Sequence, residues 1–333
     1  MSLGTSDRAL CEVYDLGMLD LDGVVFVGAD AVPGAVDALV AARKAGMRRA
    51  FLTNNASRSA SDVAEHLRHL DIEADVADVV TAAQAVAHVV ADAVPDGSAV
   101  LLVGGEGLQV PLEDRGLRCV DSLDDEPVAV VQGFHPDVGW RALAEAAYAI
   151  ESGLPWFASN ADMTIPTARG VAPGNGSLIQ AVSNATGTRP TVAGKPESAL
   201  FDEVLARMPA KRPIMVGDRL DTDIEGAINA GIDSLVVLSG VASMQDVASL
   251  AADHRPTFVG PDLSALVAPH PEVSVDETSA TCGAAIAVAT NDAVRVSQGE
   301  PGSLEAIRAV TTLAWSLRDR SGRDVRLDGT LES

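Results

Sequence analysis

The sequence has few of the residues that mark disulfide-rich or nucleic-acid-binding proteins. Its 333 residues include only three cysteines and 3% aromatic residues, and 24 Lys and Arg stand against 47 Asp and Glu, for a formal net charge of −23. Cys11, Cys119 and Cys282 lie far apart, which fits reduced thiols and predicts no disulfide. The negative charge opposes binding to nucleic acid or anionic membranes, since both need clustered Lys and Arg.

Long apolar runs are also missing. No stretch reaches the roughly 18 to 20 consecutive apolar residues of a membrane helix, and the N-terminus lacks a basic region followed by an apolar run. We therefore expect a cytoplasmic protein. The same negative charge would repel a phosphorylated substrate, so a site for one must supply positive charge through a metal, a lysine or helix N-termini.

What the chain does have is an alternation of apolar strand patterns and amphipathic helices. Residues 16–27 are predicted to form a buried strand, residues 33–47 a helix opened by Pro33, residues 48–54 a second strand and residues 59–70 a helix capped by Ser59 or Ser61. This is the βαβ pattern of a parallel sheet.

A second set of elements occupies residues 81–190, after which the first pattern resumes. The sequence thus predicts an α/β fold: a doubly wound parallel-sheet (Rossmann-like) core from residues 1–80 and 191–268, with an inserted α/β cap domain at 81–190. A small C-terminal α+β appendage follows at 269–333, with strands at 281–289 and 293–298 joined by an Asn-Asp turn, and a helix at 303–318.

Four short polar segments follow predicted strands or precede predicted helices, where open α/β folds place their sites. They are Asp20-Leu21-Asp22-Gly23, Thr53-Asn54-Asn55, Gly194-Lys195-Pro196, and the run from Gly217 to Asp223.

In the first segment an apolar strand runs into two carboxylates separated by one residue, and Gly23 lets the chain turn. One acid could attack phosphorus while the other protonates the leaving oxygen and then activates water. A polar strand end with a turn is the alternative. In the fourth segment Asp218 and Asp223 offer hard oxygen ligands that suit Mg²⁺, whereas Asp221 fits better as a stabiliser of a helix N-terminus.

The other two segments supply groups for an anion. Thr53 offers a hydroxyl, and Asn54 and Asn55 favour turns that expose backbone N–H groups, although an ordinary loop would look the same. Lys195 is one of only three lysines in the chain and lies between Gly and Pro just before a helix. Its compact charge suits phosphate, and a solvated surface lysine is the alternative.

In this order the four segments resemble the haloacid dehalogenase superfamily of phosphatases, over about residues 15–265. The most similar branch is the group of p-nitrophenylphosphatases, pyridoxal phosphatases and phosphoglycolate/glycerol-3-phosphate phosphatases. The resemblance implies that Asp20 is the nucleophile that forms an aspartyl-phosphate, and that Asp22 is the general acid/base. It also implies that Thr53, Asn54, Asn55 and Lys195 bind the phosphoryl group.

The resemblance further implies a Mg²⁺ cofactor held by Asp20, the backbone carbonyl of Asp22, and Asp218, with Asp223 in support. The cap is inserted after the second motif, because Lys195 lies 142 positions after Thr53. Capped relatives often associate through their caps, so the expected partners are a small phosphate ester and a second copy of the chain in a homodimer, with no nucleic acid and no membrane.

The loop from Asn160 to Pro166 resembles the substrate-facing cap loop of this branch, which makes Thr164 and Ile165 candidate substrate contacts. Relatives that take pyridoxal phosphate place a histidine where this chain has Ile165. A small aliphatic ester therefore fits better, with glycerol 3-phosphate first and 2-phosphoglycolate second. Cap core or a dimer contact is the alternative for these residues, and a broad-specificity, pyridoxal or nucleotide phosphatase is the alternative function.

Three other functions fit the sequence less well. A dehalogenase does not need the second acid, so Asp22 favours phosphoryl chemistry; a phosphomutase normally has its cap between the first two motifs. A non-catalytic phosphate-binding sensor is disfavoured by the intact motifs. Residues 298–303 could suggest an acyl-CoA-type phosphate loop, but the loose glycine spacing favours a tail that packs on the core.

Overall fold

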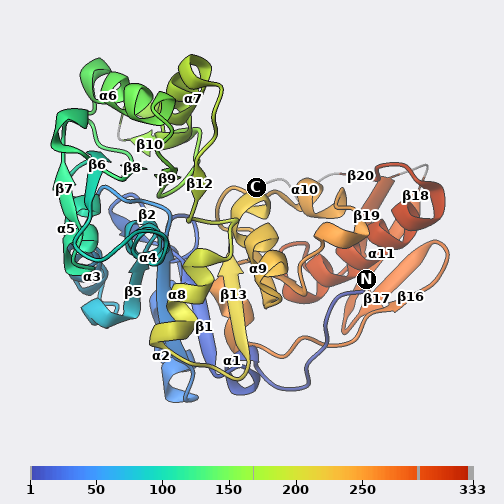
Figure 1. Ribbon diagram of the computed structural model, residues 1–333. Helices are drawn as coiled ribbons and strands as arrows, with labels where there is room; N and C mark the ends of the chain where they lie inside the picture. Colours follow the sequence, from blue (N-terminus) through green and yellow to red (C-terminus); the bar gives the residue numbers. More distant parts are fainter. Residues whose placement is uncertain (1, 168, 291–292, 329–333) are drawn as a thin grey trace. The chain divides into compact units, whose positions relative to one another are not determined.

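The computed structural model describes residues 2–167, 169–290 and 293–328 (Figure 1). The chain forms two compact units, and each is described by itself. The first unit comprises Met1–Ala50, Leu70–Ile72 and Ala210–Ser333, and the second comprises Phe51–His69 and Glu73–Pro209. The domain boundaries given above stay a prediction.

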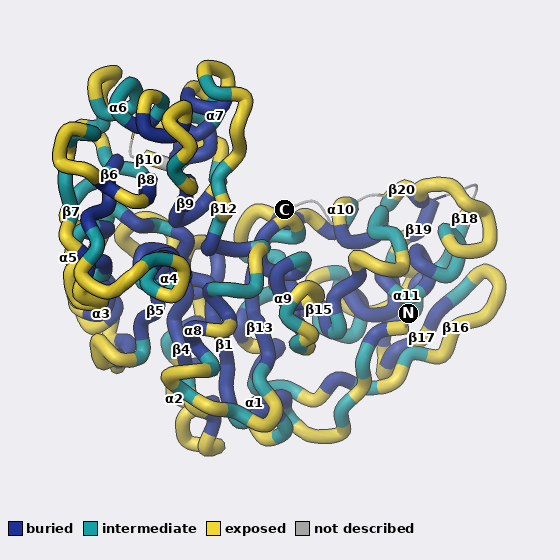
Figure 2. Tube along the Cα trace, in the orientation of Figure 1, coloured by how far each residue is buried: buried dark blue, intermediate teal, exposed yellow. Residues whose placement is uncertain are grey.

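The first unit contains a sheet with the strand order β15-β14-β13-β1-β4. The pairs β1–β13, β13–β14 and β14–β15 are parallel. Every residue of β1 is buried, as expected of a parallel strand covered on both faces (Figure 2). The elements around this sheet are α1 (Leu10–Val13), β1 (Leu16–Asp20), β2 (Phe26–Val27), β3 (Asp30–Ala31), α2 (Ala35–Lys44), β4 (Arg48–Thr53), β13 (Pro213–Gly217), α9 (Glu225–Ala230), β14 (Asp233–Val237), α10 (Met244–Ala248) and β15 (Phe258–Gly260).

The prediction of one strand over residues 16–27 was wrong. Strand β1 ends at Asp20, and the chain then turns, with Gly23 at a φ of 86° and the Val25 N–H donating to the Leu21 carbonyl at 2.9 Å. A two-stranded hairpin of β2 and β3 follows. The apolar residues of 24–27 look like a continuing strand, but a positive φ at Gly23 breaks the extended backbone.

The C-terminal part of the first unit is a second sheet with the order β16-β17-β18-β19-β20, packed against helix α11. The predicted strand at 281–289 is two strands, because Gly283 turns the chain at a φ of 54°. The Asn-Asp turn at 291–292 lies outside the described residues. The elements are β16 (Ser274–Val275), β17 (Ser279–Cys282), β18 (Ala285–Thr290), β19 (Ala293–Gln298), α11 (Leu304–Ser321) and β20 (Arg326–Leu327).

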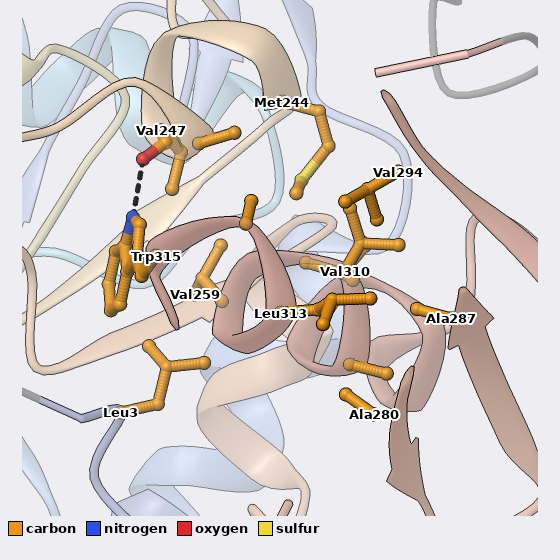
Figure 3. Close-up of a cluster of buried hydrophobic side chains, with 14 of the residues drawn as sticks. Leu3, Met244, Val247, Val259, Ala280, Ala287, Val294, Val310, Leu313 and Trp315 are labelled. Atoms are coloured by element: carbon orange, nitrogen blue, oxygen red, sulfur yellow. Dashed lines mark hydrogen bonds between the residues drawn. The ribbon is translucent and has the colours of Figure 1, made fainter. Parts of the chain in front are cut away.

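This C-terminal part shares a hydrophobic core with the rest of the first unit. Val310 and Leu313 of α11 belong to one cluster with Val259 of β15 and Met244 of α10, and Leu3 joins it (Figure 3). The indole N–H of Trp315 donates to the Val247 carbonyl at 2.8 Å. The appendage is therefore docked on its neighbours by buried apolar surface, which is the main stabilising term in folding.

A buried basic centre lies in the same region. Arg308 is fully buried and donates to the carbonyls of Pro271 and Gly4 and, at 3.1 Å, to His270 Nδ1. Since a guanidinium can only donate, His270 accepts at Nδ1 and donates from Nε2 to the Ala265 carbonyl, as a neutral imidazole. Burial, with the nearby charge of Arg308, lowers the pKa of His270 to about 4.

The second unit contains a five-stranded sheet of order β12-β9-β8-β6-β7, in which all neighbours are parallel. The end of β4 also pairs with β5 in this unit. The elements are α3 (Ala60–His69), β5 (Val79–Thr81), α4 (Ala82–Ala93), β6 (Ala99–Val103), α5 (Glu106–Asp114), β7 (Arg118–Val120), β8 (Ala129–Gln132), α6 (Trp140–Glu151), β9 (Trp156–Ala158), β10 (Thr164–Thr167), β11 (Gly170–Pro173), α7 (Asn175–Thr186), β12 (Thr191–Val192) and α8 (Ala199–Arg207).

One local prediction for this unit, a helix cap, is confirmed, and another, a loop, is wrong. Ser59 caps α3 as predicted, because its hydroxyl accepts from the Asp62 N–H while the Asp62 carboxylate accepts from the Ser59 N–H. The predicted loop from Asn160 to Pro166 runs into strand β10, which forms an antiparallel hairpin with β11. Its strands are largely exposed, so no buried face produces a clear period in the sequence.

A buried acidic residue joins three helices of the second unit. The Glu203 carboxylate of α8 contacts His88 of α4 at 2.5 Å, Arg115 at the end of α5 at 3.0 Å, and Arg207. Burial alone would raise the pKa of Glu203, but the hydrogen bond with His88 and the charges of Arg207 and Arg115 outweigh it and lower that pKa. The charge of Glu203 is thus balanced by side chains of the same unit.

Within the described residues, no helix is both long enough and apolar enough to cross a membrane.

Candidate active site

Three buried carboxylates gather in the first unit at the carboxyl edge of its parallel sheet. Asp20 is the last residue of β1, and Asp218 follows β13, the neighbouring strand, in which Val216 pairs with Leu19. Asp223 belongs to a short π-helical turn, Leu220–Ile224. Oxygens of the three carboxylates all lie within 4.8 Å of one another. The first and fourth sequence motifs therefore meet, as expected of strand ends at one sheet edge.

Backbone donors and glycines hold two of these acids in place. The Asp223 carboxylate accepts from the N–H groups of Asp218 and Arg219 at 3.1 and 3.0 Å, and Asp218 Oδ2 accepts from the Val241 N–H at 2.7 Å. A Cβ atom at Gly240 would lie 1.9 Å from Asp218 Oδ2. Only glycine therefore leaves room for the carboxylate at this point.

Gly23 and Gly217 have the same role. A Cβ atom at Gly23 would lie 2.3 Å from Asp218 Oδ2, and one at Gly217 would lie 2.2 Å from the Asp223 Cβ. Both glycines belong to the sequence motifs, so part of what makes the motifs recognisable is the space that the carboxylates need.

The donor set fits a hard divalent cation. Three carboxylates this close repel one another, and burial adds to the cost of their charge. A cation such as Mg²⁺ prefers carboxylate oxygens and offsets that repulsion. Asp221 lies outside this group and forms an exposed ion pair with Arg219 at 2.8 Å, in line with its expected place at a helix start.

The second acid of the first motif has different surroundings. Asp22 is exposed and sits in the turn after β1, where it bridges to Phe26. The next residue, Gly23, is held on both sides: its N–H donates to the Phe26 carbonyl at 2.8 Å, and its carbonyl accepts from the Ser239 hydroxyl at 2.8 Å. The turn that carries Asp22 is therefore fixed, while its side chain can reach solvent.

A second polar cluster lies in the second unit and brings together the other two motifs. Thr53, Asn54 and Lys195 are buried. The Lys195 N–H donates to Asn54 Oδ1 at 2.9 Å, and Asn54 Nδ2 donates to the Lys195 carbonyl at 3.0 Å. The second and third motifs are thus joined directly, although 141 residues separate Asn54 from Lys195.

The two residues beside Asn54 shape the loop after β4. The Thr53 hydroxyl oxygen accepts from the Asn55 N–H at 3.0 Å, which leaves the hydroxyl hydrogen to be donated. The Asn55 side chain accepts from the backbone and the hydroxyl of Ser57 at 2.9 and 2.7 Å. In this structure the Asn55 side chain organises the turn, while any substrate contact by it stays a prediction.

The cap-loop candidates lie on the hairpin of the second unit. Thr164 and Ile165 belong to β10 and pair with Pro173 and Ala172 of β11. Thr164 is exposed and Ile165 is half-buried. Their contact with a substrate stays a prediction.

Sequence reasoning missed several buried amides of the second unit. Asn160, Asn175 and Gln132 are buried and linked by hydrogen bonds, and Asp162 accepts from Asn54 Nδ2 at 3.1 Å. One signal was available for two of them: Gln132 ends strand β8 and Asn175 opens helix α7, and strand and helix ends also carry the motif residues.

Relatives of known name match this chain along most of its length. It is 43% identical over 331 residues to a D-glycerol 3-phosphate phosphatase of Mycobacterium tuberculosis, covering 96% of this chain and 92% of the relative. It is 34% identical over 257 residues to an acid sugar phosphatase of Staphylococcus aureus, covering 77% of this chain and 97% of the relative.

Solved structures give the same picture. The glycerol phosphate phosphatase of Mycobacterium tuberculosis in complex with magnesium superposes with a TM-score of 0.84 at 41% identity, covering 96% of this chain and 94% of that one. A p-nitrophenyl phosphatase from Archaeoglobus fulgidus gives 0.70 at 28% identity, covering 76% and 98%. Residues 17–118 match the family model described as haloacid dehalogenase-like hydrolase, and residues 192–266 match a second model of that kind. The chain belongs to the haloacid dehalogenase-like hydrolases.

Proposed function

We propose that this chain is a Mg²⁺-dependent phosphomonoester hydrolase that acts on a small phosphorylated metabolite through an aspartyl-phosphate intermediate. The observation that carries the proposal is the gathering of Asp20, Asp218 and Asp223 at one sheet edge. A nucleophilic carboxylate beside a cation-binding pair is what phosphoryl transfer to an aspartate requires.

In the proposed reaction the Asp20 carboxylate attacks phosphorus in line, and the bond from phosphorus to the alcohol oxygen breaks. Asp22 donates a proton to the departing alcohol and then takes one from the water that hydrolyses the acyl-phosphate, which regenerates Asp20. The exposed side chain of Asp22 suits this role, because the departing alcohol and then the attacking water must both reach it.

Residues of the second unit are proposed to hold the phosphoryl oxygens. Thr53 would donate from its hydroxyl, Asn54 from its backbone N–H and Lys195 from its ammonium group, with Asn55 shaping the loop. Asp20, Asp218, Asp223 and the Asp22 carbonyl would hold Mg²⁺, which when bound supplies positive charge against the developing charge of the phosphoryl group.

Glycerol 3-phosphate is the proposed substrate, with 2-phosphoglycolate second. The mycobacterial relative that matches nearly the whole chain bears the name D-glycerol 3-phosphate phosphatase. The residues from Met163 to Ile165 on the cap hairpin carry no charged or aromatic group, which suits a small uncharged alcohol better than a nucleotide base or a pyridine ring. Sugar phosphates are a further candidate class, because relatives at 34% identity are named acid sugar phosphatases.

A steady-state comparison of esters tests the proposal. Both enantiomers of glycerol 3-phosphate, 2-phosphoglycolate, sugar phosphates, pyridoxal phosphate and nucleoside monophosphates would be compared by kcat/KM in the presence of Mg²⁺. We expect glycerol 3-phosphate to be hydrolysed best. A flat profile would favour a broad-specificity enzyme, and no phosphate release from any ester would refute the function itself.

The cytoplasmic location, the homodimer through the cap and the lack of nucleic-acid or membrane partners stay predictions. Fractionation of cells and the molecular mass in solution would test the first two.

A further inference from the structure

A path of buried amide side chains runs through the second unit. Gln132 ends strand β8, Asn175 opens helix α7, Asn160 follows β9, and Asn54 follows β4; their exposed fractions are 0, 1, 4 and 9%. Gln132 Nε2 donates to Asn175 Oδ1 at 3.4 Å, Asn175 Nδ2 to the Asn160 carbonyl at 2.7 Å, and Asn160 Nδ2 to the Asn54 carbonyl at 2.8 Å. The sheet of this unit is thereby linked to the loop that follows Thr53.

At the end of this path the Asn54 side chain forms two hydrogen bonds with the main chain of Lys195. Its oxygen accepts from the Lys195 N–H, and its amide nitrogen donates to the Lys195 carbonyl and to Asp162 Oδ1. An amide has two N–H bonds, so both are used in these contacts. The Asn54 side chain therefore fixes the backbone of Lys195 and has no N–H left for a phosphoryl oxygen.

Asn160 closes a ring with Asn54 and Asp162. Its nitrogen donates to the Asn54 carbonyl and to Ser159 Oγ at 3.2 Å, and its oxygen accepts from the Asp162 N–H at 3.2 Å. Asp162 in turn accepts from Asn54. Asn160 thus holds the main chain of the two residues whose side chains meet beside Lys195.

The main chain next to the ring of Asn54, Asn160 and Asp162 is closely packed against it. A Cβ atom at Gly194, the residue before Lys195, would lie 2.8 Å from Asn54 Oδ1 and 2.6 Å from the Ser159 carbonyl. A close-packed, hydrogen-bonded group of this kind holds one arrangement, because each displaced member leaves another polar group unsatisfied in a buried place.

We infer that Asn160 is a positioning residue for phosphate binding: through the ring with Asn54 and Asp162 it sets the place of the Lys195 backbone. The inference rests on the proposed function, in which Lys195 binds the phosphoryl group. Asn160 itself does not contact the substrate in this proposal. The hydrogen bonds between the Asn54 side chain and the Lys195 backbone depend on Asn160, which lies in the loop after β9.

The test is the affinity for inorganic phosphate, the product of the proposed reaction, in wild type and in Asn160→Ala. We expect the inhibition constant of phosphate and the KM of the ester to rise about tenfold or more, the range seen when a supporting hydrogen-bond partner of a site is lost. The Mg²⁺ concentration for half-maximal activity should stay unchanged, because Asp20, Asp218 and Asp223 belong to the first unit.

Two further variants separate positioning from a loss of structure. Val182→Ala opens a cavity in the apolar core of the same unit and should lower the melting temperature without weakening phosphate binding. Asn160→Asp keeps the volume and the acceptor for the Asp162 N–H but loses the donor to the Asn54 carbonyl. It should weaken phosphate binding as Asn160→Ala does, and it serves in its place if that variant does not fold.

A double variant tests the route through Asn54. If Asn160 acts through Asn54, then Asn54→Ala with Asn160→Ala should bind phosphate no more weakly than Asn54→Ala alone. Additive losses would contradict the route. Unchanged phosphate affinity in both Asn160 variants, or a loss equal to that of Val182→Ala, would overturn the inference.

The outcome for the proposed function is separable from this one. Phosphate binding can be measured by calorimetry with Mg²⁺ present, without turnover. If the wild type hydrolyses no ester, the proposed function fails, and the calorimetric comparison still decides whether Asn160 affects phosphate binding. A wild type that binds no phosphate would overturn the inference too.

Discussion

Glu203 in the second unit and the Asp20, Asp218 and Asp223 group in the first are two buried acidic centres with different surroundings. Glu203 is one carboxylate met by three basic side chains, His88, Arg115 and Arg207. The first-unit group is three carboxylates that lie close to one another, and Asp218 and Asp223 also accept hydrogen bonds from backbone N–H groups.

Under the proposed function, this difference separates a structural centre from a functional one. Basic side chains of the second unit balance the charge of Glu203. This site therefore holds helices α4, α5 and α8 together without needing an ion from solution. The three-carboxylate group concentrates negative charge at a sheet edge, and oxygen ligands of this kind suit a divalent cation such as Mg²⁺. Four experiments test this contrast.

Asp20→Asn removes the proposed nucleophile while keeping its shape. We expect kcat to fall by about a thousandfold or more, since loss of a nucleophile in other enzymes costs at least this much. Steady-state kinetics and circular dichroism would show lost turnover with an intact fold. Asp221→Asn is the matched control, because Asp221 lies in the same region but outside the group, and it should keep near wild-type turnover. Normal turnover by Asp20→Asn would refute the mechanism.

Glu203→Gln leaves three basic side chains beside a neutral amide. We expect the free energy of unfolding to fall by about 3 kcal/mol, the lower end for breaking a buried ion pair, because the basic partners are each about one third exposed. Denaturant titration measures it. Asp218→Asn is the contrast: in metal-free buffer it should cost less than Glu203→Gln, because it relieves repulsion. Equal losses would contradict the distinction between the two centres.

Chelation and addition of Mg²⁺ test whether the first-unit group takes a cation. Chelator should abolish turnover reversibly, and Mg²⁺ at about 100 times its Kd should raise the free energy of unfolding by about 2.7 kcal/mol. Calorimetry of wild type and Asp218→Asn would measure the gain, which should vanish in the variant. If Mg²⁺ does not change the stability of the wild type, the assignment of a cation site to this group is refuted.

His270 extends the contrast to the buried basic centre with Arg308. Its pKa of about 4 in the folded chain lies below the ordinary value of 6.5, so the unfolded chain binds more protons between these values. Stability from neutral His270 is present above pH 6.5 and is lost as the pH falls, by about 2 kcal/mol between pH 7 and pH 5. Hydrogen exchange of α11 amides would follow it.

His270→Gln supplies the control for this pH dependence. A glutamine can donate to the Ala265 carbonyl and accept from Arg308 as the neutral imidazole does, but it does not titrate. The variant should therefore lose the slope between pH 7 and pH 5, whereas His254→Gln, at an exposed position, should keep it. A slope unchanged by His270→Gln would assign the effect to other groups.

Much of the fold and part of the candidate site could be predicted from the sequence because their signals are local. Asp20 ends one short apolar strand and Asp218 follows another. Parallel strand ends share an edge, so the pattern predicts that these two residues meet. The hairpin after Asp20 was missed because Phe26 and Val27 continue the apolar composition of β1, and only the φ of Gly23 separates them.

The amide ring could not be predicted in the same way. Asn160 and Asn54 are 106 residues apart, and a single asparagine gives no periodic signal that would announce a buried partner. Lys195 stood out because lysine is rare in this chain, but the way its backbone is held by Asn54 depends on tertiary packing. Composition thus indicated Lys195, whereas the hydrogen bonds that hold its backbone are visible only in the structure.

The split of the first unit along the sequence has a consequence for protein synthesis. A ribosome delivers β1 with Asp20 early, but β13 and Asp218 follow almost 200 residues later, which takes about 10 to 40 s at ordinary elongation rates. The last pieces, α11 with Arg308, must still reach Gly4 and Leu3 near the start of the chain. Residues 73–209 of the second unit emerge within that interval, so this unit can fold while the carboxylate group is still unassembled. A chain interrupted before β13 would therefore contain Thr53, Asn54 and Lys195, the proposed phosphate-binding residues, without Asp218 and Asp223.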